Sequence, residues 1–125
     1  FWEKATILHM LHHQPEGKEI APRMSRHYYD IHRLSLGPVL EQALNATDLL
    51  ERVAAFKGVY FKAAWAKYEE ARPGTLRLVP GDRIVSALAE DYGKMQPMFF
   101  AEPPSFEEIL AHLPELETRI NESRH

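Results

Sequence analysis

Residues 25–34, SRHYYDIHRL, carry charged, aromatic and aliphatic side chains at helical spacing. In a helix, Arg26, Asp30 and Arg33 lie at i, i+4 and i+7, so one carboxylate lies between two guanidinium groups on a single face. Tyr28 lies on a different side, with other apolar residues that the helix can bury. The charged face is then either a ladder of ion pairs in solvent or part of a site that other elements complete.

The helical pattern continues on both sides of this stretch. Apolar residues recur every three to four positions and predict helices over about residues 1–13, 22–37, 39–45, 47–60, 82–96 and 105–120. Proline and glycine bound a short irregular or extended stretch near residues 75–80. We therefore expect an all-α fold, an antiparallel helical bundle of roughly five to seven helices.

Local patterns refine this prediction. Pro22 suits the first turn of the second helix. The clearest core stripe consists of Leu49, Val53, Phe56 and Tyr60. Ser105 and Glu108 form a capping box at the start of the last helix. Pro114 interrupts that helix, so we expect a kink or two short helices there.

The composition fits one globular domain. The chain has 125 residues, of which 45% are hydrophobic and 26% are charged. The absence of cysteine excludes disulfides, cysteine zinc sites and a thiol nucleophile. No apolar run approaches the length of a membrane span, so we expect no membrane partner and a cytoplasmic location by default. The pattern of the first helix is already present at Phe1, without an initiator Met or a capping residue, and predicts a piece of a longer protein.

Two features of the first helix suggest chemistry. Lys4 lies within its apolar stripe, so the ammonium must either reach water or meet an anion. His9 and His13 lie at i and i+4, a spacing that can share a metal ion. Histidines near a helix C-terminus also interact favourably with the helix dipole, so both interpretations stay open.

Binding of nucleic acid is the remaining possibility that composition raises. The net charge of −3 argues against bulk attraction to nucleic acid. A local mixture of basic and aromatic residues nevertheless has the composition of an RNA-binding surface and comprises Phe61, Lys62, Trp65, Lys67, Tyr68, Arg72 and Arg77. The same residues also suit an ordinary helix with its aromatic side chains turned inward.

The order of several short motifs carries a family resemblance. EKA at residues 3–5, followed by a turn and then by RHYYDI at residues 26–31, resembles the later motifs of the AbiEii/AbiGii toxin family of nucleotidyltransferases. Further similar phrases are RPGTLRLVP, DYGKMQPMFF, PPSFEEIL and LETRIN. The resemblance covers nearly the whole chain and is to the C-terminal helical part of that family.

The resemblance implies roles for particular residues. Lysine at the position of Lys4 and aspartate at the position of Asp30 complete a catalytic site in the family, and Arg26 and Arg33 are then candidates to bind substrate. The family often has Asp where this chain has His27. The metal-binding acids follow a Gly-Ser motif in an N-terminal polymerase-beta-like domain that this chain does not contain, so we expect no metal ligands within it.

The leading hypothesis is therefore the C-terminal helical domain of a toxin-like nucleotidyltransferase. The resemblance implies transfer of a nucleotidyl group from an NTP to RNA, with tRNA as the leading acceptor, Mg²⁺ in the full-length protein, and a separate antitoxin protein in a bacterial cytoplasm. Because the catalytic motifs lie elsewhere, the fragment alone is expected to be inactive. The alternative is a non-enzymatic helical protein-interaction module whose charged helix contacts another protein.

Overall fold

The computed structural model describes residues 1–15, 20–60, 64–95 and 104–122. Within these ranges the α-helices are α1 (Trp2–His13), α2 (Ser25–Ser35), α3 (Val39–Leu44), α4 (Thr47–Tyr60), α5 (Asp82–Met95) and α6 (Phe106–Asn121). Two short 3₁₀ turns, η1 (Ala64–Ala66) and η2 (Tyr68–Glu70), follow α4. The predicted all-α fold is confirmed, since the described residues form six α-helices and no strand.

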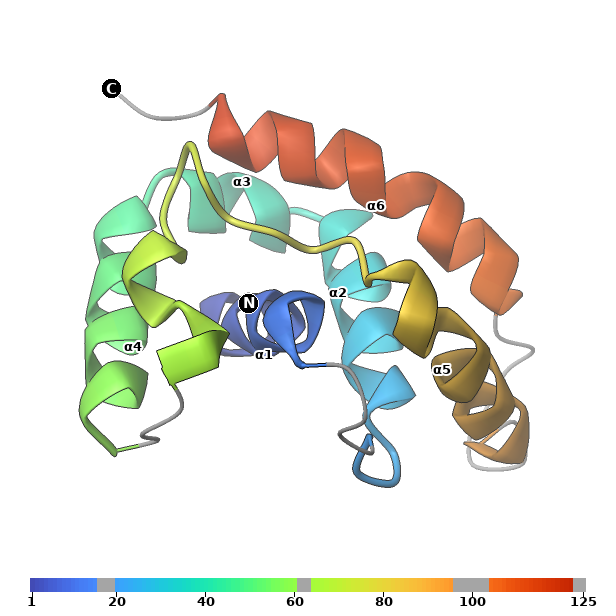
Figure 1. The fold of residues 1–125 in the computed structure, drawn as a ribbon. Helices are drawn as coiled ribbons and strands as arrows, with labels where there is room; N and C mark the ends of the chain where they lie inside the picture. The colour runs from blue at the N-terminus through green and yellow to red at the C-terminus, as the bar shows by residue number, and fades with distance from the viewer. Residues whose placement is uncertain (16–19, 61–63, 96–103, 123–125) are drawn as a thin grey trace.

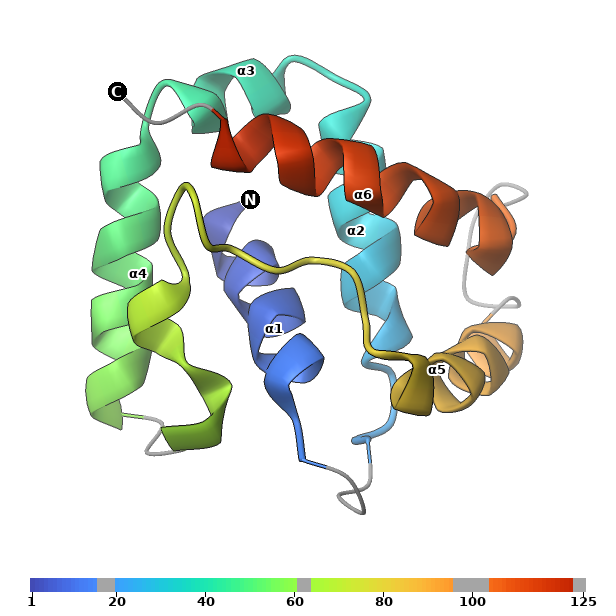
Figure 2. The same cartoon turned by 45° about the horizontal axis from the view of Figure 1, so that its top comes forward.

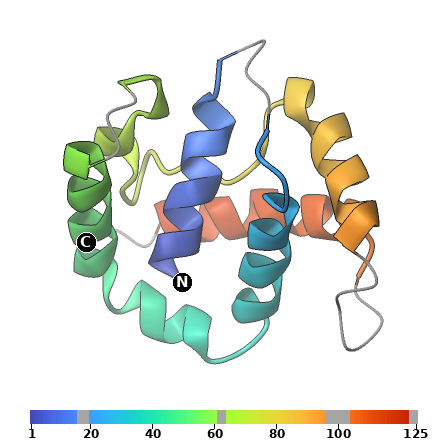
Figure 3. The same cartoon turned by 90° about the horizontal axis from the view of Figure 1, so that it is seen from below.

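Helix α1 lies at the centre of the fold, between α2 and α4, as two views show (Figure 1, Figure 3). The predicted apolar stripe is buried, with Ala5, Leu8 and Leu11 at most 2% exposed. Thr6 and His9 are also fully buried, because η1 and η2 cover a further side of the helix. A helix enclosed in this way has few positions from which a polar side chain can reach water.

Residues 71–81 cross α1 beside α6 (Figure 2). They begin with a turn at 73–75 and continue as an irregular segment without a sheet partner. This is the irregular stretch that the sequence predicts near residues 75–80. Leu76 and Leu78 anchor it in the core, each 0% exposed. Asn121 of α6 accepts hydrogen bonds from the backbone N–H groups of Gly74 and Leu76 at 3.0 and 3.1 Å, and donates to the Leu76 carbonyl at 2.9 Å.

Two further side chains hold the second half of this segment. A Glu117 carboxylate oxygen accepts hydrogen bonds from the backbone N–H groups of Leu78 and Val79 at 2.7 and 3.1 Å. From the other side, the His12 ring Nδ1 donates to the Val79 carbonyl at 2.7 Å. Buried backbone groups need partners, and here side chains of α1 and α6 replace the missing ladder of a sheet.

The start of α2 differs from the prediction. Pro22 does not begin the helix, because Arg23 has φ 69° in the left-handed region and the helix starts at Ser25. The Asp91 carboxylate of α5 accepts hydrogen bonds from the backbone N–H groups of Arg23 and Ser25 at 2.9 and 3.0 Å, and a further one from the Ser25 hydroxyl. A carboxylate from another helix thus satisfies the free donors that a local cap would normally bind.

The predicted core stripe on α4 is wrong. Three of its members are exposed, Leu49 by 45%, Phe56 by 58% and Tyr60 by 69%. The buried face is instead the one that carries Leu50 and Ala54, against which α1 and η2 pack. Helix α4 has apolar residues on two faces, and spacing alone does not identify the face that meets α1.

Two predictions concern the last helix. The Ser105 hydroxyl accepts a hydrogen bond from the backbone N–H of Glu108 at 3.1 Å, which is one of the two bonds of the predicted capping box. Pro114 does not split α6, which continues through it from Phe106 to Asn121. Pro114 lies at an exposed position and removes one hydrogen bond of the helix, the bond to the carbonyl four residues earlier.

We expect Asn121→Ala to lower the free energy of unfolding by about 1–3 kcal/mol, because it leaves three backbone groups of the crossing segment without their partner. Urea denaturation of the purified chain measures this change. Glu115→Ala, at an exposed position of the same helix, is the matched control and should stay within about 0.5 kcal/mol. Equal midpoints for the two variants would contradict the role of Asn121.

Asp91→Ala should destabilise the chain by about 1–2 kcal/mol at pH 7. Burial opposes ionisation, yet hydrogen bonds from Ser25 and Arg23 lower the pKa of Asp91 below its ordinary value. A carboxyl whose pKa is lower in the folded state stabilises that state above its unfolded pKa and loses this contribution as pH falls through the folded pKa. The difference between wild type and variant should therefore shrink below about pH 4, whereas Glu90→Ala should show little difference at any pH.

Candidate functional site

Lys4 of α1 and Asp30 of α2 form an ion pair, with 3.3 Å between Nζ and Oδ2. Their side chains are 34% and 23% exposed, so the pair lies at the rim of the core with access to solvent. Arg26, one turn before Asp30, places its Nε 3.9 Å from the same oxygen. Of the two outcomes open to Lys4, the structure shows the one in which the ammonium meets an anion.

His27 completes the surroundings of Lys4. Its Nδ1 lies 3.3 Å from the Lys4 Nζ, a distance at which a neutral imidazole accepts a hydrogen bond from the ammonium. Burial lowers the pKa of His27, and the charge of Lys4 lowers it further, whereas Asp30 acts in the opposite direction. The imidazole is therefore held in the neutral state in which Nδ1 can accept.

The local fold explains why these groups meet. His27 and Asp30 lie at i and i+3 on α2, beside Tyr28 and Ile31, which are 0% exposed and pack in the core. Burying these two apolar residues brings the adjacent polar edge of α2 against the first turn of α1. Lys4 reaches that edge because α1 and α2 pack directly on each other.

Arg33 does not join this group. It is exposed on α2, and within the described part of the chain no ion pair links it to Asp30. The structure thus brings together Lys4, Asp30 and Arg26 and leaves Arg33 on the surface nearby. The charged face of α2 thus contains an ion pair within the helix, between Arg26 and Asp30, and an ion pair from Asp30 to Lys4 of α1.

A second ion pair holds the first turn of α1 from the opposite side. Lys57 of α4 donates to the Glu3 backbone carbonyl at 3.2 Å, and its Nζ lies 3.2 Å from the Glu3 carboxylate. Lys57 is only 5% exposed, which is rare for a lysine. Consecutive residues Glu3 and Lys4 therefore bind opposite charges on the two helices that flank α1.

Two histidines at the end of α1, His9 and His12, have hydrogen-bond partners in the backbone. His9 Nε2 donates to the Lys67 carbonyl at 2.8 Å, and its Nδ1 accepts the Arg77 backbone N–H at 3.0 Å. Burial lowers the pKa of His9 to about 4, in keeping with a neutral ring. Because both ring nitrogens are engaged, His9 has no lone pair left for the metal ion that its spacing to His13 suggested.

The Mg²⁺ expected for nucleotidyl transfer does not fit the described residues. Magnesium favours several oxygen ligands, often carboxylates. Here a single carboxylate, Asp30, has two cationic side chains beside it, Lys4 and Arg26. In the ranges that the structure covers, no cluster of three or more histidine or acidic side chains suits a metal ion.

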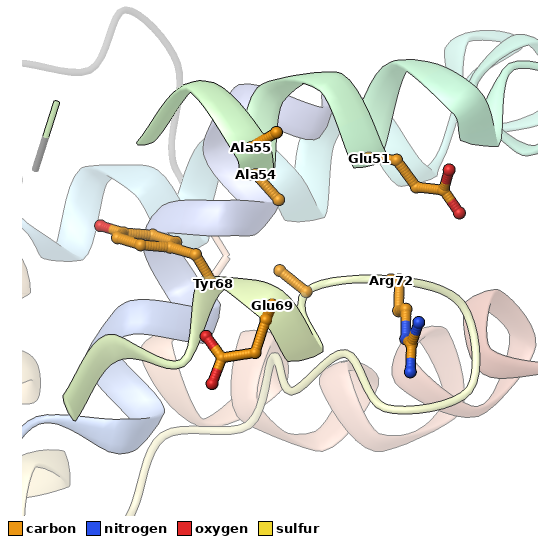
Figure 4. Close-up of a pocket in the computed structure, with 7 residues that line it drawn as sticks. Glu51, Ala54, Ala55, Tyr68, Glu69 and Arg72 are labelled. Carbon is orange, nitrogen blue, oxygen red and sulfur yellow. The ribbon is translucent and has the colours of Figure 1, made fainter. Parts of the chain in front are cut away.

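Two hollows among the described residues lie away from these ion pairs. One lies between α4 and η2, where charged Glu51, Glu69 and Arg72 surround small alanine side chains and Tyr68 (Figure 4). Another, largely apolar, is lined by residues of α1, α3 and α4, among them Trp2 and Leu49. Neither of these two hollows includes Lys4 or Asp30.

The basic and aromatic segment is only partly available for RNA. Phe61 and Lys62 lie outside the described residues. Tyr68 is 8% exposed and packs inward, and Arg77 forms an ion pair with Glu117 at 3.3 Å. Lys67 and Arg72 are exposed, so the segment has fewer free basic groups than its sequence suggests.

Comparison with known protein families identifies the family of this chain. Residues 1–112 match the family described as nucleotidyl transferase AbiEii toxin of a Type IV toxin–antitoxin system. The chain belongs to this family. The resemblance drawn from residues 3–5 and 26–31 is thereby confirmed. Membership in this AbiEii family indicates toxin-like nucleotidyl transfer and implies an antitoxin partner.

Searches of curated proteins and of solved structures each found no match. Along the described helices, none combines the length and apolarity needed to cross a membrane. No relative or solved structure from these searches assigns roles to residues of this AbiEii chain.

Sequence reasoning missed two contacts of the site. His27 lies one turn before Ile31, but nothing in its spacing shows that it receives the Lys4 ammonium. Lys57 is spaced at i+3 from buried Ala54, and this is a usable signal only once the exposed and buried faces of α4 are known.

Lys4→Met should raise the pKa of His27, because the nearby positive charge that favours the neutral ring is removed while Asp30 stays. A pH titration of the His27 ring by NMR measures the change. Arg33→Met removes an exposed cation on the same helix and is the control, for which we expect no shift. If both variants titrated like wild type, the Lys4 to His27 contact would not exist in solution.

Proposed function

We propose that this chain is the helical part of an AbiEii-type enzyme that transfers a nucleotidyl group from an NTP to an RNA acceptor, with tRNA as the leading candidate. The observation that supports it is the 3.3 Å ion pair between Lys4 and Asp30. These are the two positions at which the family resemblance expects a catalytic lysine and aspartate. They are 26 residues apart in the sequence and belong to different helices.

The reaction needs the cation that Lys4 offers. An acceptor hydroxyl gives its proton to a general base of the full-length enzyme and forms a bond to the α-phosphorus. The bond from that phosphorus to the oxygen that bridges it to the β-phosphate breaks, and diphosphate leaves. Negative charge on the phosphates must be stabilised throughout, and a fixed ammonium does so without further reorganisation. Asp30 and His27 hold the Lys4 amine in place at 3.3 Å each.

The two arginines suit binding of substrate phosphates. Arg26 is half exposed beside Asp30, and Arg33 is exposed further along α2. Guanidinium groups bind phosphate oxygens in a bidentate manner, so a phosphate chain lying along α2 would meet Arg26 first and Arg33 next. Asp30 lies between the two arginines, and Lys4 offsets its negative charge. A phosphate ligand would therefore meet a surface with a net positive charge.

The remaining catalytic groups belong to another part of the full-length protein in this proposal. The acids that bind Mg²⁺ would follow the Gly-Ser motif of a polymerase-beta-like domain, and residues 1–125 alone would be inactive. The antitoxin would restrain the enzyme in a bacterial cytoplasm. Under this division of roles, the helical part supplies cations that face the bound NTP.

A second candidate function, a helical protein-interaction module, has one observation in its favour. Helix α4 exposes a group of large apolar side chains, namely Leu49, Phe56, Val59 and Tyr60. The Phe56 and Tyr60 rings are 4.5 Å apart between centroids and form a continuous aromatic surface. Exposed apolar patches of this kind often bind protein, and this surface is separate from the charged edge of α2.

Nucleotide incorporation by the full-length protein tests the proposal. Lys4→Met and Asp30→Asn should each reduce incorporation of labelled nucleotide into RNA at least about 100-fold, because each removes a group fixed at the reacting phosphates. Lys94→Met, at a cation that is 74% exposed on α5, should retain wild-type activity.

Circular dichroism of each variant separates catalysis from folding. We expect the helical signal of Lys4→Met and Asp30→Asn to equal that of wild type, since both sites are partly exposed. Wild-type incorporation by either variant would remove that residue from the site. A full-length protein that incorporates no nucleotide, with its metal-binding acids present, would favour the interaction module instead.

A further inference from the structure

Lys57 is a buried charge for which the proposed site has so far no role. Lys57 is 5% exposed, whereas several large apolar side chains of the same helix, α4, face solvent. Burial lowers the pKa of Lys57, and the Glu3 hydrogen bond and charge only oppose that effect. Buried ion pairs often stabilise a fold less than apolar residues of similar size, so stability alone gives little reason for a lysine here.

The contacts of Lys57 converge on one residue of α1. Its amine donates to the Glu3 backbone carbonyl at 3.2 Å and lies 3.2 Å from the Glu3 carboxylate. The Thr6 hydroxyl donates to the same carbonyl at 2.8 Å. The peptide that joins Glu3 to Lys4 is therefore held by α4 as well as by its own helix.

Lys4 begins at that peptide and extends to the other side of α1. Its amine lies 3.3 Å from both the Asp30 carboxylate and the His27 ring. A shift or rotation of the first turn of α1 would move the Lys4 amine away from these partners. Lys57 opposes such movement from the side of α4, as Asp30 does from the side of α2.

We propose that Lys57 is a positioning residue for nucleotidyl transfer: through Glu3 it fixes the first turn of α1, and so the place of the Lys4 ammonium beside Asp30 and His27. The inference rests on the proposed function, because it assigns to Lys4 the stabilisation of phosphate charge. Lys57 itself touches no substrate in this proposal. Its effect on the reaction passes through the backbone at Glu3.

Lys57→Met in the full-length protein is the first test. It keeps an apolar side chain of similar length and removes both contacts to Glu3. We expect kcat for nucleotide incorporation to fall about 10–100-fold, because a displacement of a catalytic group by roughly 1 Å lowers the rate on this scale. The KM for the nucleotide should change less than about threefold. Lys57→Arg should recover part of the loss, and Lys94→Met should behave as wild type.

The ¹⁵N resonance of His27 Nδ1 reports on the place of the Lys4 ammonium. The charge of Lys57 itself also acts on His27, so Lys57→Arg, which keeps that charge, separates position from charge. In wild type this nitrogen accepts a hydrogen bond from Lys4, and Lys4→Met defines the resonance without it. We expect Lys57→Met to move the resonance toward the Lys4→Met position at a pH where the ring is neutral. A wild-type resonance together with wild-type kcat would overturn the proposal.

Glu3→Gln keeps the inference testable if Lys57→Met fails to fold. The Glu3 side chain is 66% exposed, so its replacement does not threaten the core, yet it removes the charged half of the contact. We expect a smaller loss of kcat, about 3–10-fold, and a partial change of the His27 resonance. Unchanged values of both would overturn the proposal. If wild type shows no transferase activity, the proposed function fails, whereas the His27 resonance still reports whether Lys57 positions Lys4.

Discussion

The enclosure of α1 constrains the rest of the structure. Neighbouring elements cover this helix on several sides, yet its sequence carries charged and imidazole side chains from Glu3 to His13. Buried polar groups need hydrogen-bond partners, so each of the flanking elements must supply some. Helix α2 supplies Asp30, α4 supplies Lys57, and the segment over residues 71–81 supplies backbone groups for the histidines.

The same constraint explains how an irregular segment persists inside an all-α fold. Without a neighbouring strand, its backbone N–H and carbonyl groups bind side chains of α1 and α6. Glu117 and Asn121 lie one turn apart on α6, so a single face of that helix follows the segment along its length. On the side of α1, His9 and His12 bind the backbone of the segment at Arg77 and Val79.

Much of the fold could be predicted from apolar spacing, because that spacing determines which helices form. The faces they bury were harder to predict where two apolar faces compete, as on α4, where Ala54 packs inward and Phe56 faces solvent. Small side chains permit close approach of α1 and η2, and no spacing rule weighs this advantage against the larger apolar area of the other face. Asp91 was missed for a related reason, since it caps a helix that begins more than 60 residues earlier.

The site shows the same division between local and distant information. Arg26 and Asp30 share a helix, so their spacing predicts their approach, and the family motif relates Asp30 to Lys4. The contacts of His27 and Lys57 depend on how α2 and α4 pack against the first turn of α1. No local sequence pattern contains this information. An arrangement of opposite charges on both sides of one turn contributes modestly to stability, because desolvation offsets much of the attraction. It does fix the direction of the Lys4 amine, and a cation with a fixed direction is what stabilisation of a phosphoryl transition state requires.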